Sequence, residues 1–178
     1  MSEDILVRLL GASELEAYLD HMMRLDGPAR AQRFAAGVDD HFILSHCLHM
    51  IVSRTSLIGV FVDGTLRGAA ELEVDDDGAT GELVMAIEKP WRGRGLGRQL
   101  AAAAIAEARR RGVGAIRIDI EATDEATRAI ALGHGFRSQG GRRTVTYQLT
   151  LDGRGREDTG ETPSSRWWNP FRTAARSA

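Results

Sequence analysis

Glycine and arginine alternate in one short segment that leads directly into a long stretch of helix-forming residues. Residues 91–98 read Trp-Arg-Gly-Arg-Gly-Leu-Gly-Arg, and an alanine-rich helix is expected over residues 98–111. Backbone N–H groups at the start of a helix, together with the positive end of its dipole, favour an anion. Glycines allow a phosphate oxygen to approach the main chain, and arginines add positive charge. The segment therefore predicts a binding site for phosphate or pyrophosphate.

Two common phosphate-binding motifs do not fit this segment. A nucleotide P-loop requires Gly-Lys followed by Ser or Thr, whereas Gly97 is followed here by Arg98. A dinucleotide-binding fingerprint that begins at Gly93 or Gly95 requires a glycine where Arg98 or Leu100 stands. The alternative without a ligand is an ordinary strand-to-helix connection with exposed arginines.

Several residues of metal-binding type lie in one predicted helix. His41, His46, Cys47 and His49 fall within residues 39–54, where two histidines three positions apart can share a helix face. The sequence has no second cluster of ligands, and Cys47 falls on the apolar face of the helix. We therefore expect no metal site.

The elements around these residues alternate between strand and helix. Hydrophobic periodicity predicts helices that begin at residue 13 and near residue 30, and others over residues 39–54, 98–111 and 124–134. Strands are expected over residues 5–10, 57–62, 66–74, 80–88, 116–120 and 144–151. Turn residues separate the second, third and fourth strands, so these strands should form an antiparallel meander. The pattern predicts a mixed α/β domain.

The composition is that of one ordinary globular domain. The chain has 178 residues, of which 43% are hydrophobic and 27% charged, enough for a sizeable core. A net charge of −2 offers no overall attraction to nucleic acid or to an anionic membrane. One cysteine, an acidic N-terminus and the absence of a long apolar run predict a cytoplasmic protein without membrane spans.

The small net charge hides an uneven distribution along the chain. Residues 1–90 hold 7 basic and 16 acidic residues, whereas residues 91–178 hold 16 basic and 9 acidic ones. The positive half begins at the glycine–arginine segment, where a polyanion is expected. The negative half would suit a cationic second ligand.

The segment contains the motif R-x-x-G-x-G, formed by Arg92, Gly95 and Gly97 between a predicted strand and a predicted helix. This motif resembles the loop that holds the pyrophosphate of acetyl-CoA in the GNAT N-acetyltransferase superfamily. The resemblance spans residues 5–151 and includes the order of the elements. It implies a GNAT fold, with a mixed, mostly antiparallel sheet flanked by helices, and a splayed strand that pairs with the pantetheine arm. The cofactor-binding residues that it implies are Ile87, Arg92, Gly93, Arg94, Gly95, Leu96, Gly97, Arg98 and Asp124.

Acetyl transfer to an amine requires a general base. An ammonium group with a pKa near ~10.4 must lose a proton before its nitrogen can attack, and a positioned carboxylate can accept that proton. Strand alternation places one candidate, Glu82, at the start of residues 80–88, far along the strand from the glycine loop. A solvated strand carboxylate is the alternative for that residue. The candidate carboxylates are Glu71, Glu73, Glu82 and Glu88.

Within the superfamily, the chain most resembles the catalytic domain of bacterial Pat-type protein lysine acetyltransferases. The match lies in Glu-Leu-Val-Met-Ala-Ile over residues 82–87, followed by the glycine loop, and in the pair Arg33-Phe34. The corresponding glutamate is the general base in that group. The resemblance therefore implies this role for Glu82.

One residue typical of the superfamily is missing. Many members have a tyrosine, in the short helix before Gly-Phe, that protonates the departing thiolate. Counting back from Gly135 and Phe136 places Ala131 at that position, a departure shared with the Pat-type pattern. The acid role is left to solvent or to Tyr147 or His134.

We expect the catalytic domain to span residues 1–151 and residues 152–178 to form a flexible C-terminal tail. The tail is rich in Gly, Arg, Ser and Thr and lacks hydrophobic periodicity. An aromatic segment in it would dock on a partner protein or on the domain itself, or would be incidental to a disordered tail. The segment consists of Trp167, Trp168, Asn169, Pro170 and Phe171.

These inferences predict an enzyme that transfers an acetyl group directly from acetyl-CoA to a primary amine. The Pat-type resemblance suggests a protein lysine as the acceptor. A small-molecule amine is the alternative, because the chain lacks the large modules that Pat-type enzymes often carry. A third alternative is a catalytically silent acyl-CoA-binding module, suggested by the missing tyrosine and the aromatic tail. The protein is expected to act as a monomer or homodimer.

Overall fold

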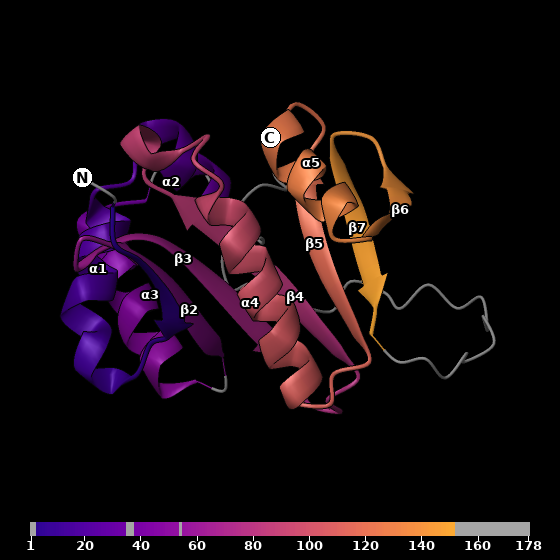
Figure 1. Cartoon of the computed structure of the whole chain (residues 1–178), viewed down its shortest axis with the longest axis horizontal. Helices are drawn as coiled ribbons and strands as arrows, with labels where there is room; N and C mark the ends of the chain where they lie inside the picture. The colour runs from indigo at the N-terminus through magenta and orange to yellow at the C-terminus, as the bar shows by residue number, and fades with distance from the viewer. Residues whose placement is uncertain (1–2, 35–37, 54, 152–178) are drawn as a thin grey trace, which may run out of the picture.

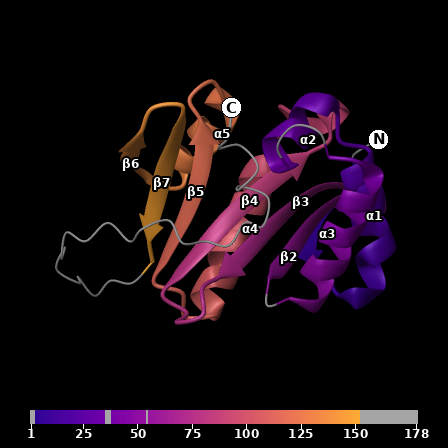
Figure 2. The same cartoon turned by 180° about the vertical axis from the view of Figure 1, so that it is seen from behind.

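Seven strands form one sheet with helices on both faces (Figures 1 and 2), in a computed structural model that describes residues 3–34, 38–53 and 55–151. The strands are β1 (Ile5–Leu9), β2 (Ser56–Val62), β3 (Thr65–Val74), β4 (Thr80–Ile87), β5 (Ala115–Glu121), β6 (Arg137–Gly141) and β7 (Thr144–Thr150). The helices are α1 (Leu15–Met23), α2 (Gly27–Phe34), α3 (Asp40–Val52), α4 (Leu96–Arg110) and α5 (Glu125–Gly133), with short 3-10 turns η1 (Ala12–Glu14) and η2 (Lys89–Trp91).

The strand order across the sheet is β1-β2-β3-β4-β5-β7-β6. Every neighbouring pair is antiparallel except β4 and β5, which run parallel. Positive φ angles at Asp63 (48°) and Gly64 (78°) close the tight turn between β2 and β3, as the Asp-Gly pair predicts. The sheet is therefore mixed and mostly antiparallel, and the expected meander of β2, β3 and β4 is confirmed.

Two hydrophobic clusters hold the helices to opposite faces of the sheet. Helix α4 crosses one face over β2, β3 and β4, seen in Figure 1, and its Leu100 and Ala104 belong to one buried cluster that also contains Ile116 and Ile118 of β5. Helices α1 and α3 cover the other face over β2 and β3, seen in Figure 2, and there Tyr18 is completely buried. Side chains of β2 and β3 thus meet α4 or the α1–α3 pair according to their parity along the strand.

The parallel strands β4 and β5 separate after a short paired stretch. Only three residues of β4 pair with β5, at Thr80, Gly81 and Glu82. Beyond Glu82, β4 stays paired with β3 and β5 stays paired with β7, so the two strands diverge (Figure 2). The main chain of residues 83–87 therefore has no partner strand on its β5 side. The expected splayed strand is confirmed.

Strand β6 was not expected from the sequence. Its residues, Arg-Ser-Gln-Gly-Gly, show no apolar alternation, and all five are exposed at the edge of the sheet. Pairing with β7, with a register shift between Ser138 and Gly140, makes them a strand. A neighbouring strand therefore determined this element, and no local pattern predicted it.

Some expectations concern parts of the chain without a structural description. The proposed tail, residues 152–178 with its aromatic segment, lies outside the described residues. In the part of the chain that the structure covers, no helix is long and apolar enough to cross a membrane.

Candidate active site

An open cavity of about 700 Å³ lies where β4 and β5 separate. Its walls are residues 82–87 of β4, the glycine loop, the first turns of α5, the side of α2, and Ile118 and Asp119 of β5. The fold thus brings segments from most of the chain to one cleft. The predicted site residues that line it are Glu82, Ile87, Arg92, Gly93, Gly95, Leu96, Gly97, Arg98 and Asp124.

The glycine loop forms one end of the cavity and has the geometry of an anion site. Gly93 and Gly95 have φ angles of +76° and +82°, and a Cβ built on either would meet no atom within 4 Å. Gly95 is the N-cap of α4, so the N–H groups of Leu96, Gly97 and Arg98 have no acceptor within the helix. No acidic residue lies in this first turn. The start of α4 therefore offers N–H donors beside open space at this end of the cavity.

Gly97 serves helix packing. A Cβ on Gly97 would lie 2.9 Å from Cδ1 of Ile130, so the bare glycine lets α5 approach the first turn of α4. Leu96 beside it is 2% exposed and packs in the core under the loop. Leu96 and Gly97 therefore fix the loop against the core and α5, while Gly93 and Gly95 leave its cavity side open.

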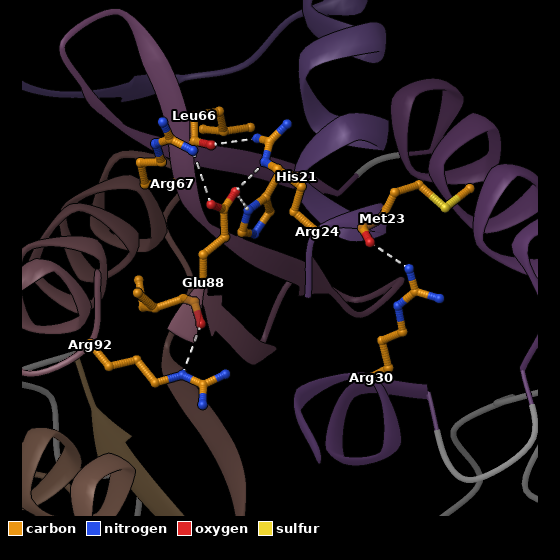
Figure 3. Close-up of polar contacts among 9 residues, drawn as sticks. His21, Met23, Arg24, Arg30, Leu66, Arg67, Glu88 and Arg92 are labelled. Carbon is orange, nitrogen blue, oxygen red and sulfur yellow. Dashed lines mark hydrogen bonds and ion pairs between the residues drawn. The ribbon is translucent and has the colours of Figure 1, made fainter. Parts of the chain in front are cut away.

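The loop arginines differ in what they contact. The Arg92 guanidinium donates to both carboxylate oxygens of Asp26, at 2.6 and 3.3 Å. Figure 3 shows its other bond, from Arg92 Nε to the Ile87 carbonyl at 3.0 Å. The bond from Arg92 lowers the pKa of Asp26. Arg92 thus ties the loop to the start of α2. Arg98 lies in the first turn of α4 with its side chain exposed at the cavity.

Arg94 is the one predicted cofactor residue that does not line the cavity. Its guanidinium pairs with Glu3 at 2.7 Å and stacks 4.7 Å from the centre of the Trp91 ring. Arg67 stacks on the same ring at 5.0 Å. In this arrangement Arg94 holds Trp91 at the entry to the loop.

Glu88 anchors the end of β4, immediately before the loop. Its carboxylate is 3% exposed and accepts from Arg24 Nε at 2.8 Å, from His21 Nδ1 at 3.2 Å and from Arg67 at 3.2 Å (Figure 3). Burial alone would raise the pKa of Glu88, but the bonds from His21 and Arg24 outweigh it and lower that pKa. Glu88 therefore joins α1 and β3 to the loop and does not line the cavity.

Glu82 lies at the opposite end of the cavity from the loop. It is exposed and stands at the last point where β4 and β5 are paired. Its cross-strand neighbours are Glu73 on β3 and Arg117 on β5. Arg33 lines the same cavity from α2 and interacts electrostatically with Glu82. Of the four candidate glutamates, Glu82 alone lines the cavity.

A buried ionic network supports this end of the cavity. Glu71, 5% exposed, accepts from Tyr18 Oη at 2.6 Å and pairs with the Arg33 guanidinium, whose Nε donates at 3.1 Å. His46 Nε2 lies 3.3 Å from Glu71 and 3.0 Å from Arg33. Burial alone would raise the pKa of Glu71, but Arg33 and His46 outweigh it and hold that pKa well below its usual range. Sequence analysis did not predict this network, because its members lie far apart in the sequence and only the Arg33-Phe34 pair of α2 had been singled out.

The fold and this cavity agree with what comparison with known proteins finds. Residues 15–136 match the Acetyltransferase (GNAT) family. The chain belongs to the GNAT acetyltransferase family. This GNAT protein is accordingly an N-acetyltransferase whose acetyl donor is acetyl-CoA.

Solved structures share the fold of this GNAT acetyltransferase at low sequence identity. The protein yncA of Salmonella typhimurium, solved with acetyl-CoA, is 21% identical and matches 87% of this chain and 98% of its own, with a TM-score of 0.67. The GNAT domain of S. lividans PAT is 13% identical and matches 84% of this chain and 97% of its own, with a TM-score of 0.72. The ribosomal-protein-S18-alanine N-acetyltransferase of Escherichia coli is 19% identical and matches 86% of this chain and 98% of its own, with a TM-score of 0.66. None of the curated proteins matches the chain significantly.

Asp124 bridges two sides of the GNAT cavity. Its Oδ2 accepts from Gln32 Nε2 of α2 at 2.6 Å, and its Oδ1 accepts from the Thr127 N–H at 3.0 Å as the N-cap of α5. The bond from Gln32 joins α2 to α5. Asp124 thus reaches the cavity wall with both carboxylate oxygens already accepting hydrogen bonds.

The candidate general acids lie away from the GNAT cavity. Ala131 is buried, and Tyr147, 7% exposed, packs in the core. His134 Nε2 donates to the carbonyl of Arg98 at 3.1 Å. Neither Tyr147 nor His134 lines the cavity.

The histidines of α3 form no metal-ligand set within the residues that are described. No group of three or more His, Cys, Asp or Glu side chains there is arranged to hold a metal ion. His46 joins the Arg33–Glu71 network instead. Cys47 is completely buried, and burial raises the pKa of its thiol to about 12, so it is no thiolate ligand or nucleophile at neutral pH.

The substitution Glu71→Gln is expected to lower the free energy of unfolding at pH 7 by about 3–5 kcal/mol, because it leaves the Arg33 charge buried without its counter-ion. Because the pKa of Glu71 is depressed in the folded state, its contribution is complete above the unfolded pKa of about 4.3 and is lost as the pH falls below it. Urea unfolding at several pH values measures both effects. The gap between wild type and variant should shrink below about pH 4.3. The exposed neighbour Glu73→Gln is the control, and equal losses in both variants would contradict the assignment.

Proposed function

We propose that this acetyltransferase transfers the acetyl group directly to a primary amine, with Glu82 as the general base, and that a protein lysine is its acceptor. One observation carries the proposal: a single cavity joins a loop suited to pyrophosphate with a carboxylate at the far end of the splayed strand. Glu82 and Ile87 are about 17 Å apart along that strand. This spacing suits a long, thin cofactor arm between an anion site and a reacting group.

The residues of the loop and of β4 fit acetyl-CoA. Gly93 and Gly95 leave open space above the loop, and the start of α4 supplies N–H donors for a pyrophosphate. Arg98 adds positive charge there. The main chain of residues 83–87, unpaired on its β5 side, can pair with the amides of a pantetheine arm. When bound, acetyl-CoA supplies an activated thioester carbonyl to the acceptor amine.

In this proposal Glu82 prepares the acceptor. It accepts the proton of the acceptor ammonium, directly or through one water, so that the neutral nitrogen can attack. Arg33, held in place by buried Glu71, keeps α2 beside that carboxylate. Solvent at the open end of the cavity supplies the proton for the departing sulfur, since Tyr147 and His134 lie elsewhere.

The acceptor side of the cavity is open enough for a polypeptide. On the sheet face that carries Glu82, the strands β5, β7 and β6 present polar side chains, and α4 and α5 pack on the opposite face. An extended segment can lie there with one lysine directed at Glu82. A small-molecule amine is the second candidate, because the cleft itself is of a size that holds small ligands.

The proposal also covers the domain organisation, the location and the partners of the protein. We expect residues 1–151 to form the catalytic domain and residues 152–178 a flexible tail whose aromatic segment docks on a partner or on the domain. We expect the enzyme to work in the cytoplasm, as a monomer or homodimer, without nucleic-acid or membrane partners.

An acceptor panel tests the proposal with the full chain. Release of free CoA thiol from acetyl-CoA is measured with lysine-containing peptides, simple amines and polyamines, and mass spectrometry locates the acetyl group. We expect turnover that depends on a primary amine, with acetyl on a lysine side chain. Turnover with small amines alone would overturn the lysine acceptor. Acetyl-CoA binding without turnover of any acceptor would overturn the enzymatic proposal and favour a silent acyl-CoA-binding module.

A further inference from the structure

A row of paired side chains crosses five strands at the level of Glu82. Glu73 pairs with Glu82, Glu82 pairs with Arg117, Arg117 pairs with Gln148, and Gln148 pairs with Arg137. Paired positions present their side chains on the same face of a sheet, with about 4.8 Å between strands. The row therefore has an acidic half and a basic half, which meet between Glu82 and Arg117.

This row lies on the sheet face opposite the cluster formed with α4. The residues of β5 and β7 with the opposite parity, among them Ile116, Ile118 and Tyr147, are buried in the cluster formed with α4. In the row itself Glu82 and Arg137 are exposed, and Arg117 is half-buried. A ligand that reaches Glu82 from this side passes over Arg117.

Arg117 differs from Arg33 and Arg92 in what its side chain contacts. Within the described ranges, 3–34, 38–53 and 55–151, its side chain makes no hydrogen bond and no ion pair. Arg33 is bound to Glu71, and Arg92 is bound to Asp26. A half-buried guanidinium has lost part of its hydration, so an anionic partner would stabilise it. A negatively charged group on the acceptor can be that partner.

We propose that Arg117 binds an anionic group of the acceptor, so that the preferred acceptor is a primary amine with a carboxylate a few ångströms from its nitrogen. The ammonium lies at the acidic half of the row, beside Glu82, and the carboxylate lies at the basic half. This inference rests on the proposed function and narrows its acceptor. A free amino acid and a peptide lysine beside an acidic residue share this chemistry.

Matched acceptors test the assignment. Two peptides that differ only in Asp or Asn beside the lysine form one pair, and a free amino acid and its carboxamide form the other. We expect wild type to prefer the carboxylate member by roughly 10- to 100-fold in kcat/KM, as for a hydrogen bond between charged groups. The pair with the larger ratio identifies the source, peptide or free amino acid.

The substitution Arg117→Gln is expected to abolish that preference while leaving kcat/KM for the uncharged member and the affinity for acetyl-CoA unchanged. Arg117→Lys should retain part of it, because the charge stays but the forked geometry is lost. Arg109→Gln, the same change near the far end of α4, is the control. No preference in wild type, or a preference kept in Arg117→Gln, overturns the proposal.

A failure of the proposed function is distinguishable from a failure of this inference. If no acceptor is acetylated, binding of the same matched pairs to the CoA-saturated enzyme is measured by calorimetry. Tighter binding of the carboxylate member to wild type than to Arg117→Gln then supports the role of Arg117 even though catalysis is absent. Equal binding to both proteins overturns it.

Discussion

Replacing Glu82 by glutamine is expected to lower kcat by roughly 10²- to 10⁴-fold, the usual contribution of general-base catalysis. Glutamine has nearly the same shape but cannot accept the acceptor proton. Glu82 lies at the far end of β4 from the glycine loop, so the affinity for acetyl-CoA should stay unchanged. Steady-state thiol release gives kcat, and calorimetric titration with acetyl-CoA gives the affinity.

The matched control for this prediction is Glu73→Gln. Glu73 is the cross-strand neighbour of Glu82 and is also exposed, but it does not line the cavity. The same loss of one negative charge should therefore have only a small effect on kcat. Full turnover by Glu82→Gln at neutral pH, or equal losses in the two variants, would remove Glu82 from the role of base.

Replacing Gly95 by alanine is expected to weaken acetyl-CoA binding by about tenfold or more, equivalent to about 1.4 kcal/mol. Gly95 has a φ of +82°, and its missing Cβ leaves open space at the mouth of the anion site. A methyl group there would occupy the position that a phosphate oxygen needs to reach the N–H groups of α4. Calorimetric titration with acetyl-CoA measures the loss of affinity.

Gly112→Ala separates this effect from backbone strain. Gly112 follows the other end of α4, has a φ of +73°, and likewise has no atom within 4 Å of a Cβ built on it. An alanine at either position costs about 1–2 kcal/mol of stability for its left-handed conformation. Both variants should therefore melt at similarly reduced temperatures, but only Gly95→Ala should bind acetyl-CoA less tightly. Equal affinities in the two variants would contradict the assignment of the loop.

Much of the fold could be predicted because its signals are local. The alanine-rich run predicts α4, Asp-Gly predicts the turn between β2 and β3, and Asp124 caps α5 through a bond to Thr127 three residues later. Strand β6 was missed because pairing with β7 alone defines it. The glycine loop could be predicted because its signals are also local: positive φ angles and the start of a helix depend on neighbouring residues.

The contacts of the charged residues, in contrast, could not be predicted from local sequence. The sequence offered four candidate glutamates and favoured Glu82 through the resemblance, and pairing over long separations shows what two of the others do: Glu71 pairs with Arg33, and Glu88 lies between α1 and β3. Arg92, expected at the phosphate, lines the cavity and also pairs with Asp26, and Arg94 pairs with Glu3. Such contacts join residues tens of positions apart, and no local pattern encodes them.

The sequence by itself determined where an anion can bind, because glycine conformation and the start of a helix are properties of a few consecutive residues. It also determined the family, through that loop and the order of the elements. Only the tertiary structure decided which carboxylate faces the cavity and which arginines near it, Arg33 and Arg92, are held in ion pairs. The physical reason is that burial and ion pairing depend on which strands and helices pack together, and here Glu82 and Arg117 are cross-strand neighbours where β4 and β5 separate.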